Sequence, residues 1–262
     1  MRHRAKEMVI GKKVKPELTE KQLQEYLGVP RFLENRLPAP GRCGVITGLA
    51  WTSVGGEILL LECMLLSGKG HLIMTGKLGD VMKESAQIAL SLVRERLRRY
   101  GIDPEIVRKT DIHIHVPEGA VPKDGPSAGI ALTLALLSAF TRTPVSPEIA
   151  FTGEVSLTGD LLPIGGLNEK ALAAQEAGVK TLYLPVGNQK DVTELPAPAK
   201  KGLKIFTKKH IDDIVNELMP PKNPPKGTSR AKTAAAGKSR AAKSTAKETG
   251  AKKSSRGTNS KK

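Results

Sequence analysis

Residues 122–130, PKDGPSAGI, bring a serine to the start of a long apolar segment. The Pro and Gly residues predict a turn, and the apolar run at 128–140 has the length and period of a buried helix. Ser127 is therefore expected near a helix N-terminus, where unpaired N–H groups and the helix dipole favour negative charge. Two interpretations follow. Ser127 is an N-cap, or it is a nucleophile, and those N–H groups stabilise the oxyanion that forms when it attacks a carbonyl.

A nucleophilic serine needs a base, and the chain has neither a GxSxG motif nor an obvious Asp–His pair. Lys170 is the candidate, because it follows two glycines and starts an alanine-rich helix predicted at about 168–177. An exposed Lys170 would be an ordinary surface residue. A buried Lys170 would lose hydration, its pKa would fall from about 10.4 towards neutrality, and its neutral amine could accept the serine proton.

Thr152 and Glu154 lie on the strand predicted before this lysine. The Thr152 hydroxyl could orient the amine without charging it, or Thr152 could simply be a β-branched strand residue. His113 and His115 alternate with apolar residues on a strand predicted at 111–116. They could be bases or metal ligands, but no third ligand follows at a recognisable spacing, and the polar face of a half-buried strand is the alternative.

The elements that would position these residues form a mixed α+β (mixed α/β) fold. A hairpin is predicted from strands at 44–51 and 57–66, separated by Gly55 and Gly56, and a second one from 149–158 and 161–164. A small helix at 19–28 begins with a capping box at Thr19. The remaining predicted elements are strands at 71–75, 181–184 and 203–206 and helices at 80–100 and 211–219.

The net charge of +16 is concentrated at one end of the chain. Residues 221–262 hold thirteen Lys or Arg and one acid, Glu248, which gives +12 and leaves +4 for the rest. Without aromatic or large aliphatic residues this tail is predicted to be disordered. It either attaches non-specifically to nucleic acid or another polyanion or merely favours solubility. Two cysteines make no disulfide framework, and no apolar run reaches the ~20 residues of a membrane span.

Four blocks, in this order, resemble the proteolytic domain of the ATP-dependent Lon proteases over residues 31–219. They are GLAWTSVGGE at 48–57, LGDVMKESAQ at 78–87, PEGAVPKDGPSAG at 117–129 and LPIGGLNEKALAA at 162–174. The resemblance implies a Lon-type serine endopeptidase in which Ser127 is the nucleophile and Lys170, 43 residues later, is the general base.

The resemblance also assigns accessory positions. Thr152 falls on the family's lysine-supporting threonine, and Asp124, His113 and His115 fall on polar positions around the family's site, with Glu154 counted beside them. Asp124 could tune the site or block it. Asn168, Thr158 and Asp160 depart from positions that are usually basic in the family, which affects charge-dependent contacts near the lysine rather than the Ser–Lys pair.

The resemblance divides the chain into four parts. Residues 1–30 resemble the end of the family's small helical ATPase subdomain, 31–43 are a linker, 44–220 are the proteolytic domain and 221–262 the tail. No GxxxxGK[ST] phosphate loop occurs in the sequence, so no cofactor is expected for this chain, and ATP and Mg only for a separate ATPase module. A truncated gene product is the favoured interpretation.

The expected substrates are peptides and unfolded or damaged proteins, and the expected assembly is a homo-oligomer, hexameric by resemblance. We expect a cytoplasmic protein with no membrane partner, because the sequence has no apolar signal core. Two alternatives stay open. The chain could be a catalytically silent fragment, or it could be a binding protein held on nucleic acid by residues 221–262.

Overall fold

The computed structural model describes residues 2–11, 19, 37–52, 55–117 and 122–221. The predicted helix at 19–28 and the tail beyond residue 221 lie outside the described residues. The helices are α1 (Arg2–Val9), α3 (Asp80–Arg96), α4 (Gly129–Thr141), α5 (Leu167–Glu176), α6 (Gln189–Glu194), α7 (Ala197–Lys200) and α8 (Ile211–Leu218). Among them none is both long and apolar enough to cross a membrane.

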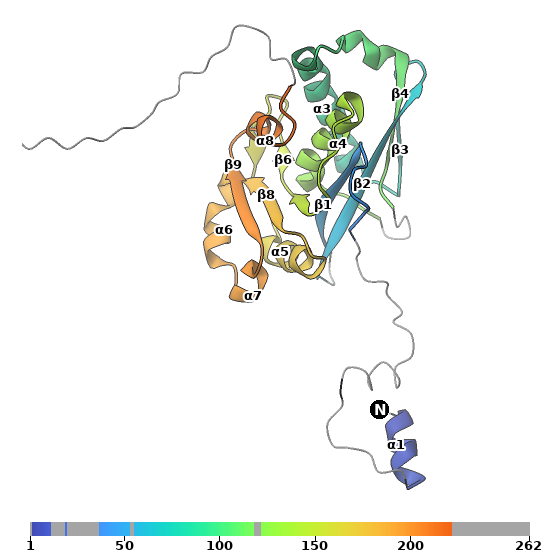
Figure 1. Ribbon diagram of the computed structural model, residues 1–262, viewed down its shortest axis with the longest axis vertical. Helices are drawn as coiled ribbons and strands as arrows, with labels where there is room; N and C mark the ends of the chain where they lie inside the picture. The colour runs from blue at the N-terminus through green and yellow to red at the C-terminus, as the bar shows by residue number, and fades with distance from the viewer. Residues whose placement is uncertain (1, 12–18, 20–36, 53–54, 118–121, 222–262) are drawn as a thin grey trace, which may run out of the picture. The chain divides into compact units, whose positions relative to one another are not determined.

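The strands form a seven-stranded mixed sheet and a small separate hairpin. The order in the sheet is β3-β4-β2-β1-β5-β8-β9 (Figure 1). β2 runs antiparallel to β1 and β4, whereas the remaining neighbours are parallel. The bounds are β1 (Val45–Thr52), β2 (Gly55–Ser67), β3 (Leu72–Thr75), β4 (Thr110–His115), β5 (Ile149–Phe151), β8 (Thr181–Pro185) and β9 (Lys204–Lys208), with β6 (Glu154–Val155) and β7 (Leu161–Leu162) in the hairpin.

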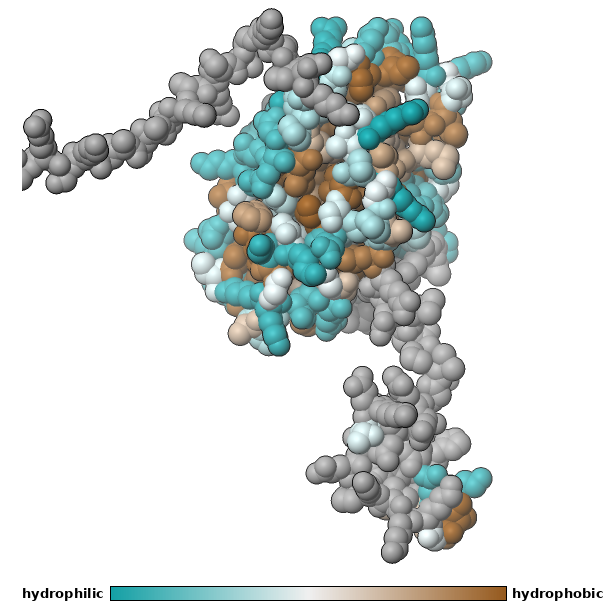
Figure 2. Space-filling model, viewed as in Figure 1, coloured by the Kyte–Doolittle hydropathy of each residue, from teal (hydrophilic) through white to brown (hydrophobic). Residues whose placement is uncertain are grey.

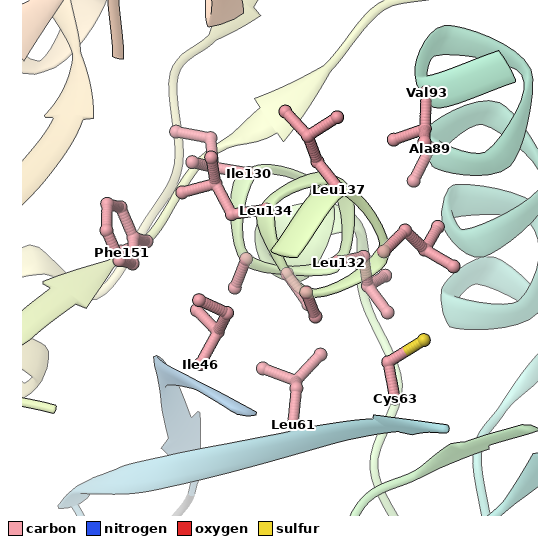
Figure 3. Packing of buried hydrophobic residues seen from close by; sticks show 14 of the residues in the cluster. Ile46, Leu61, Cys63, Ala89, Val93, Ile130, Leu132, Leu134, Leu137 and Phe151 are labelled. Atoms are coloured by element: carbon pink, nitrogen blue, oxygen red, sulfur yellow. The ribbon is translucent and has the colours of Figure 1, made fainter. Parts of the chain in front are cut away.

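The core lies on both faces of this sheet. α4 is apolar all round and is buried along residues 129–138, between the sheet and α3. Figure 3 shows α4 end on, with Ile46 and Leu61 of the sheet below it and Val93 of α3 beside it. On the opposite face α5 and α7 pack over β1, β5 and β8. The α+β fold class is therefore confirmed.

Most predicted elements are present, with informative differences at their ends. Gly55 and Gly56 do not separate the first two strands, because they belong to β2 and pair with Thr52 and Trp51. The segment predicted as one strand at 149–158 divides at Gly153 into β5 of the main sheet and β6 of the hairpin. The helix predicted at 80–100 ends as a 3₁₀ turn closed by Gly101 in the left-handed region.

Candidate active site

Ser127 lies in a short 3₁₀ turn, Pro126–Ala128, that leads into α4. Neither this turn nor α4 has a side-chain cap, so Ser127 is not the N-cap that one interpretation predicted. Its backbone is fixed by residue 153: the Gly153 N–H donates to the Ser127 carbonyl at 2.8 Å, and the Ile130 N–H donates to the Gly153 carbonyl at 3.1 Å. The hydroxyl therefore caps neither element and lies just before α4, which is buried along residues 129–138.

Lys170 lies in the first turn of α5, where the chain reverses at Gly166 with φ of +67°. The Lys170 N–H donates to the Gly166 carbonyl at 3.1 Å, which fixes the start of the helix. α5 packs closely on β2 at Gly56, where a Cβ would stand 2.0 Å from the Glu169 carbonyl oxygen. Only glycine at position 56 allows this approach, and the approach places Lys170 against the sheet.

The Lys170 side chain is buried, with an exposed fraction of 3%. Burial lowers the pKa of its amine from 10.5 to about 8, because the charged form loses hydration. In the part of the chain that the structure describes, the amine makes no hydrogen bond or ion pair that would retain its charge. With this pKa about a tenth of Lys170 is neutral at pH 7 and about half at pH 8, and the neutral amine can accept a proton.

One pocket of about 400 Å³ is lined by both Ser127 and Lys170. It lies between the β1–β2 hairpin, the turn that carries the serine and the turn that carries the lysine. Its apolar lining includes Trp51, Leu59 and Met82, and its remaining lining residues are Ala50, Thr52, Glu57, Pro122, Lys123, Asp124, Pro126, Pro163, Ile164 and Gly165. The structure thus brings together the two residues that the sequence, 43 positions apart, assigned to chemistry.

Asp124 also lines the pocket, and its carboxylate has a structural task. Its Oδ1 accepts the Met82 N–H at 3.0 Å and the Gly125 N–H at 2.9 Å. Met82 is the third residue of α3, so Asp124 caps that helix from a distant part of the chain. The cap attaches the serine turn to α3. Sequence reasoning missed this role, because a cap supplied by a distant segment leaves no local pattern.

Thr152 is fully buried, and in the described residues its Oγ1 has no hydrogen-bond partner. Its N–H donates to the Tyr183 carbonyl at 3.1 Å, which holds it between β5 and β8. Thr152 directly precedes Gly153, the residue that fixes the Ser127 backbone. Glu154 pairs with Leu162 in the small hairpin and is not among the residues that line the pocket.

His113 and His115 lie elsewhere. Both rings contact the Thr75 hydroxyl, His113 through Nε2 at 2.9 Å and His115 through Nδ1 at 2.7 Å. They line a different pocket, which contains neither Ser127 nor Lys170. Within the described ranges no group of three or more His, Cys, Asp or Glu side chains could hold a metal ion. The placement fits the polar strand face that the alternation of residues 111–116 indicated.

Comparison with known proteins identifies the family of the chain. Residues 17–221 match the Lon protease (S16) C-terminal proteolytic domain, which is most of the chain. The chain therefore belongs to the Lon protease family.

Individual Lon proteases are also similar to this chain. The chain is 48% identical over 203 residues to Lon protease 1 of Myxococcus xanthus, which covers 78% of this chain. It is 53% identical over 197 residues, 75% of its length, to the Lon protease of Heliobacterium modesticaldum. It is also 48% identical over 218 residues, 83% of its length, to Lon protease 1 of Bacillus subtilis. The matched part is only 25%, 24% and 28% of those three relatives, so the chain spans about a quarter of their length.

Proposed function

We propose that this chain is a serine endopeptidase domain that hydrolyses peptide bonds through a Ser127–Lys170 dyad. The observation that carries the proposal is the buried amine of Lys170, which has no partner among the described residues and lies in the pocket that Ser127 also lines. A lysine whose pKa is lowered in this way can act as a general base, and a serine in the same pocket can act as the nucleophile. Membership of the Lon protease family supports the same assignment.

In the proposed reaction the neutral Lys170 amine takes the Ser127 proton as Oγ attacks the scissile carbonyl carbon. The resulting ammonium returns that proton to the leaving amine, which produces an acyl-enzyme and the first product. Water, deprotonated by the same amine, then hydrolyses the ester and regenerates Ser127. Each half-reaction therefore uses Lys170 first as a base and then as an acid.

The tetrahedral oxyanion needs a donor near Ser127. The N–H groups of Gly129 and Ile130 are engaged, since they donate to the carbonyls of Pro126 and Gly153. We assign the role to the Ser127 N–H, for which the described residues provide no acceptor. The Thr152 hydroxyl is proposed to orient the Lys170 amine without adding charge, and Asp124 to act through the position of the serine turn.

The test is the initial rate of hydrolysis of an internally quenched peptide by the purified chain, without nucleotide, across pH. Ser127→Ala and Lys170→Ala are each expected to lower kcat by about a thousand-fold or more. Ser91→Ala and Lys190→Ala are matched controls on exposed helix surfaces and should leave the rate unchanged. The rate should rise with pH around an inflection near 8, the pKa to which burial lowers Lys170.

The dyad is wrong if wild type and both dyad variants hydrolyse the peptide at equal rates. It is also wrong if Lys170→Ala retains the same pH inflection. We further propose that the substrates are peptides and unfolded proteins and that the chain works as a ring, probed by sedimentation of the purified chain. Hydrolysis of folded proteins would then need an ATPase module, whereas short peptides would not.

A further inference from the structure

Glu57 brings a carboxylate to the pocket that Ser127 and Lys170 also line. It lies on β2 opposite Ala50 of β1, and it is half-buried. Among the described residues it makes no hydrogen bond and no ion pair. The proposed dyad uses neither its charge nor its oxygens, so the reaction itself leaves this carboxylate without a role.

The place of Glu57 distinguishes it from the many charged residues of the outer surface. Figure 2 shows hydrophilic residues mixed with hydrophobic ones over the visible face of the described chain. A charge on such a surface is hydrated, and salt and water screen it from a ligand. Glu57 instead lies at the wall of a pocket, where it has lost part of its hydration and has gained no partner among the described residues. A carboxylate in this position favours a ligand that brings a cation.

The other charged residues that line this pocket do not reverse the preference. Lys123 is buried and is not free, because it has an interaction of its own. Asp124 is a second carboxylate, and its Oδ1 already accepts the Met82 and Gly125 N–H groups. Lys170 is uncharged in the form that acts as a base. In that form the described lining holds two carboxylates against one cation, so the pocket is negative overall.

A neighbouring pocket of about 500 Å³ has charge of the same sign. The two pockets share Ile164 and Gly165. The described lining of this neighbour includes the carboxylates of Glu169, Asp191 and Glu194 and no lysine, arginine or histidine. A peptide that crosses the shared wall therefore stays in a field that favours positive charge.

The apolar lining of the catalytic pocket suits the stem of a long basic side chain. Trp51 lines the pocket and is 60% exposed, so its ring is accessible to a ligand. Arginine and lysine pack their methylene groups against apolar surface while the charged end stays in polar surroundings. A guanidinium also stacks on aromatic rings. One basic side chain can therefore use both Trp51 and Glu57, whereas an acidic side chain would be repelled by Glu57.

We propose that Glu57 is a specificity-determining residue that selects substrates with a basic residue, arginine or lysine, close to the scissile bond. The cationic end of that residue pairs with the Glu57 carboxylate, and its methylene stem packs against Trp51. This inference rests on the proposed function, because that function makes the pocket of Ser127 and Lys170 the site of hydrolysis. It narrows the expected substrates from unfolded chains in general to segments that contain a basic residue.

The experiment measures binding without hydrolysis, in the full chain carrying Ser127→Ala. The probe is the peptide acetyl-Gly-Ala-Leu-Arg-Leu-Ala-Gly-amide, labelled with a dye of zero net charge and followed by fluorescence anisotropy at physiological ionic strength. Two further peptides have Gln or Glu in place of Arg. All three are measured with Glu57, with Glu57→Gln and with Glu57→Lys. Glu62→Gln is the matched control, because Glu62 is a half-buried glutamate of the same strand that lines a different pocket. The basic residues 222–262 are present in every variant, so their effect cancels between variants.

We expect the Arg peptide to bind about five-fold more tightly than the Gln peptide, as a partly buried ion pair implies. Glu57→Gln should remove this preference, Glu57→Lys should shift it to the Glu peptide, and Glu62→Gln should retain it. With Ser127 restored, the ratio of kcat/KM for the Arg and Gln peptides should change in the same way. Hydrolysis of the Gln peptide by Glu57→Gln should keep the pH inflection near 8, because burial lowers the pKa of Lys170 without a contribution from Glu57.

Equal affinity for the Arg and Gln peptides would overturn the proposal, and so would a preference for Arg that persists in Glu57→Gln. Absence of binding by either peptide up to about 1 mM would also overturn it. A pH inflection displaced by Glu57→Gln would show that Glu57 acts on Lys170 instead of on the substrate. Failure of the dyad is a separate result, because binding to the chain with Ser127→Ala is measured without hydrolysis.

Discussion

Replacing Lys170 by Met should stabilise the chain at neutral pH while removing activity. Met has a similar length and carries no charge, so the variant keeps much of the packing and loses only the amine. In the wild type, burial lowers the lysine pKa from 10.5 to about 8. At about 1.4 kcal/mol per unit, this difference corresponds to roughly 3 kcal/mol by which the charged lysine destabilises the folded state.

The sign of the pH dependence follows from proton binding. Between pH 8 and 10.5 the unfolded chain keeps the Lys170 proton and the folded chain has released it, so the free energy of unfolding of the wild type rises with pH. Below pH 8 the full penalty applies, and above pH 10.5 it vanishes. The advantage of Lys170→Met should therefore be about 3 kcal/mol at pH 7 and should shrink towards zero near pH 10.5.

The assay is urea denaturation of both chains, followed by far-ultraviolet circular dichroism at pH 7, 8.5, 9.5 and 10.5. Cys63 titrates in an overlapping range, because burial raises the pKa of its thiol to about 12, but it is present in both chains and cancels in the difference. Lys190→Met, at an exposed position, is the control and should follow the wild type. A difference between wild type and Lys170→Met that stays constant with pH would refute the desolvation argument and, with it, the reason for calling Lys170 a base.

Further predictions concern the groups around the dyad and the tail. Gly56→Ala should lower the free energy of unfolding by roughly 2–3 kcal/mol in urea titration and impair hydrolysis, because its Cβ would collide with the Glu169 carbonyl, whereas Gly165→Ala, with no atom within 4 Å, should not destabilise. Asp124→Ala should lower the free energy of unfolding by about 1 kcal/mol through loss of the α3 cap, and it should also lower kcat. An unchanged kcat would show that the cap does not influence hydrolysis. Thr152→Val should raise the free energy of unfolding by about 1 kcal/mol, since it removes a buried hydroxyl that has no partner among the described residues, and peptide hydrolysis should fall; full activity of this variant would contradict the proposed support of Lys170 by Thr152. Deleting residues 222–262 should abolish salt-sensitive retention on double-stranded DNA in an electrophoretic shift assay, and retention by the shortened chain would remove the tail from that role.

The sequence predicted the parts of the fold that depend on periodic burial. The apolar face of the helix predicted at 80–100 is buried in α3, and Ile112 and Ile114 of the alternating strand are fully buried in β4. These patterns reflect only whether a side chain meets water or the core. The start of α4 at residue 129 was harder to predict from the sequence. The 3₁₀ turn before it is held by a distant residue, because the Gly153 N–H donates to the Ser127 carbonyl.

What the sequence did not predict was supplied by contacts between distant segments. The glycines of β2 were interpreted as a turn, yet Gly56 is glycine because α5 approaches it from another part of the chain. Asp124 belongs to a turn by its sequence and to the α3 cap by its contacts. The accessory histidines show the same limit, because alternation predicted their strand but could not say which pocket they would line.

The candidate site also contains buried polar groups that lack the partners such groups usually have. Among the described residues the buried Lys170 amine has no counter-charge and the buried Thr152 hydroxyl has no hydrogen-bond partner, and each lowers stability. Lys170 lines the pocket of Ser127, and Thr152 precedes Gly153, whose N–H donates to the Ser127 carbonyl. Elsewhere the buried Arg96 is paired with Asp212 at 2.6 Å, so a buried cation in this fold can have a carboxylate partner. An amine that was paired in this way would keep its proton and could not act as a base. We therefore propose that the unsatisfied groups at Lys170 and Thr152 are needed for the chemistry, and their removal should raise stability and lower activity.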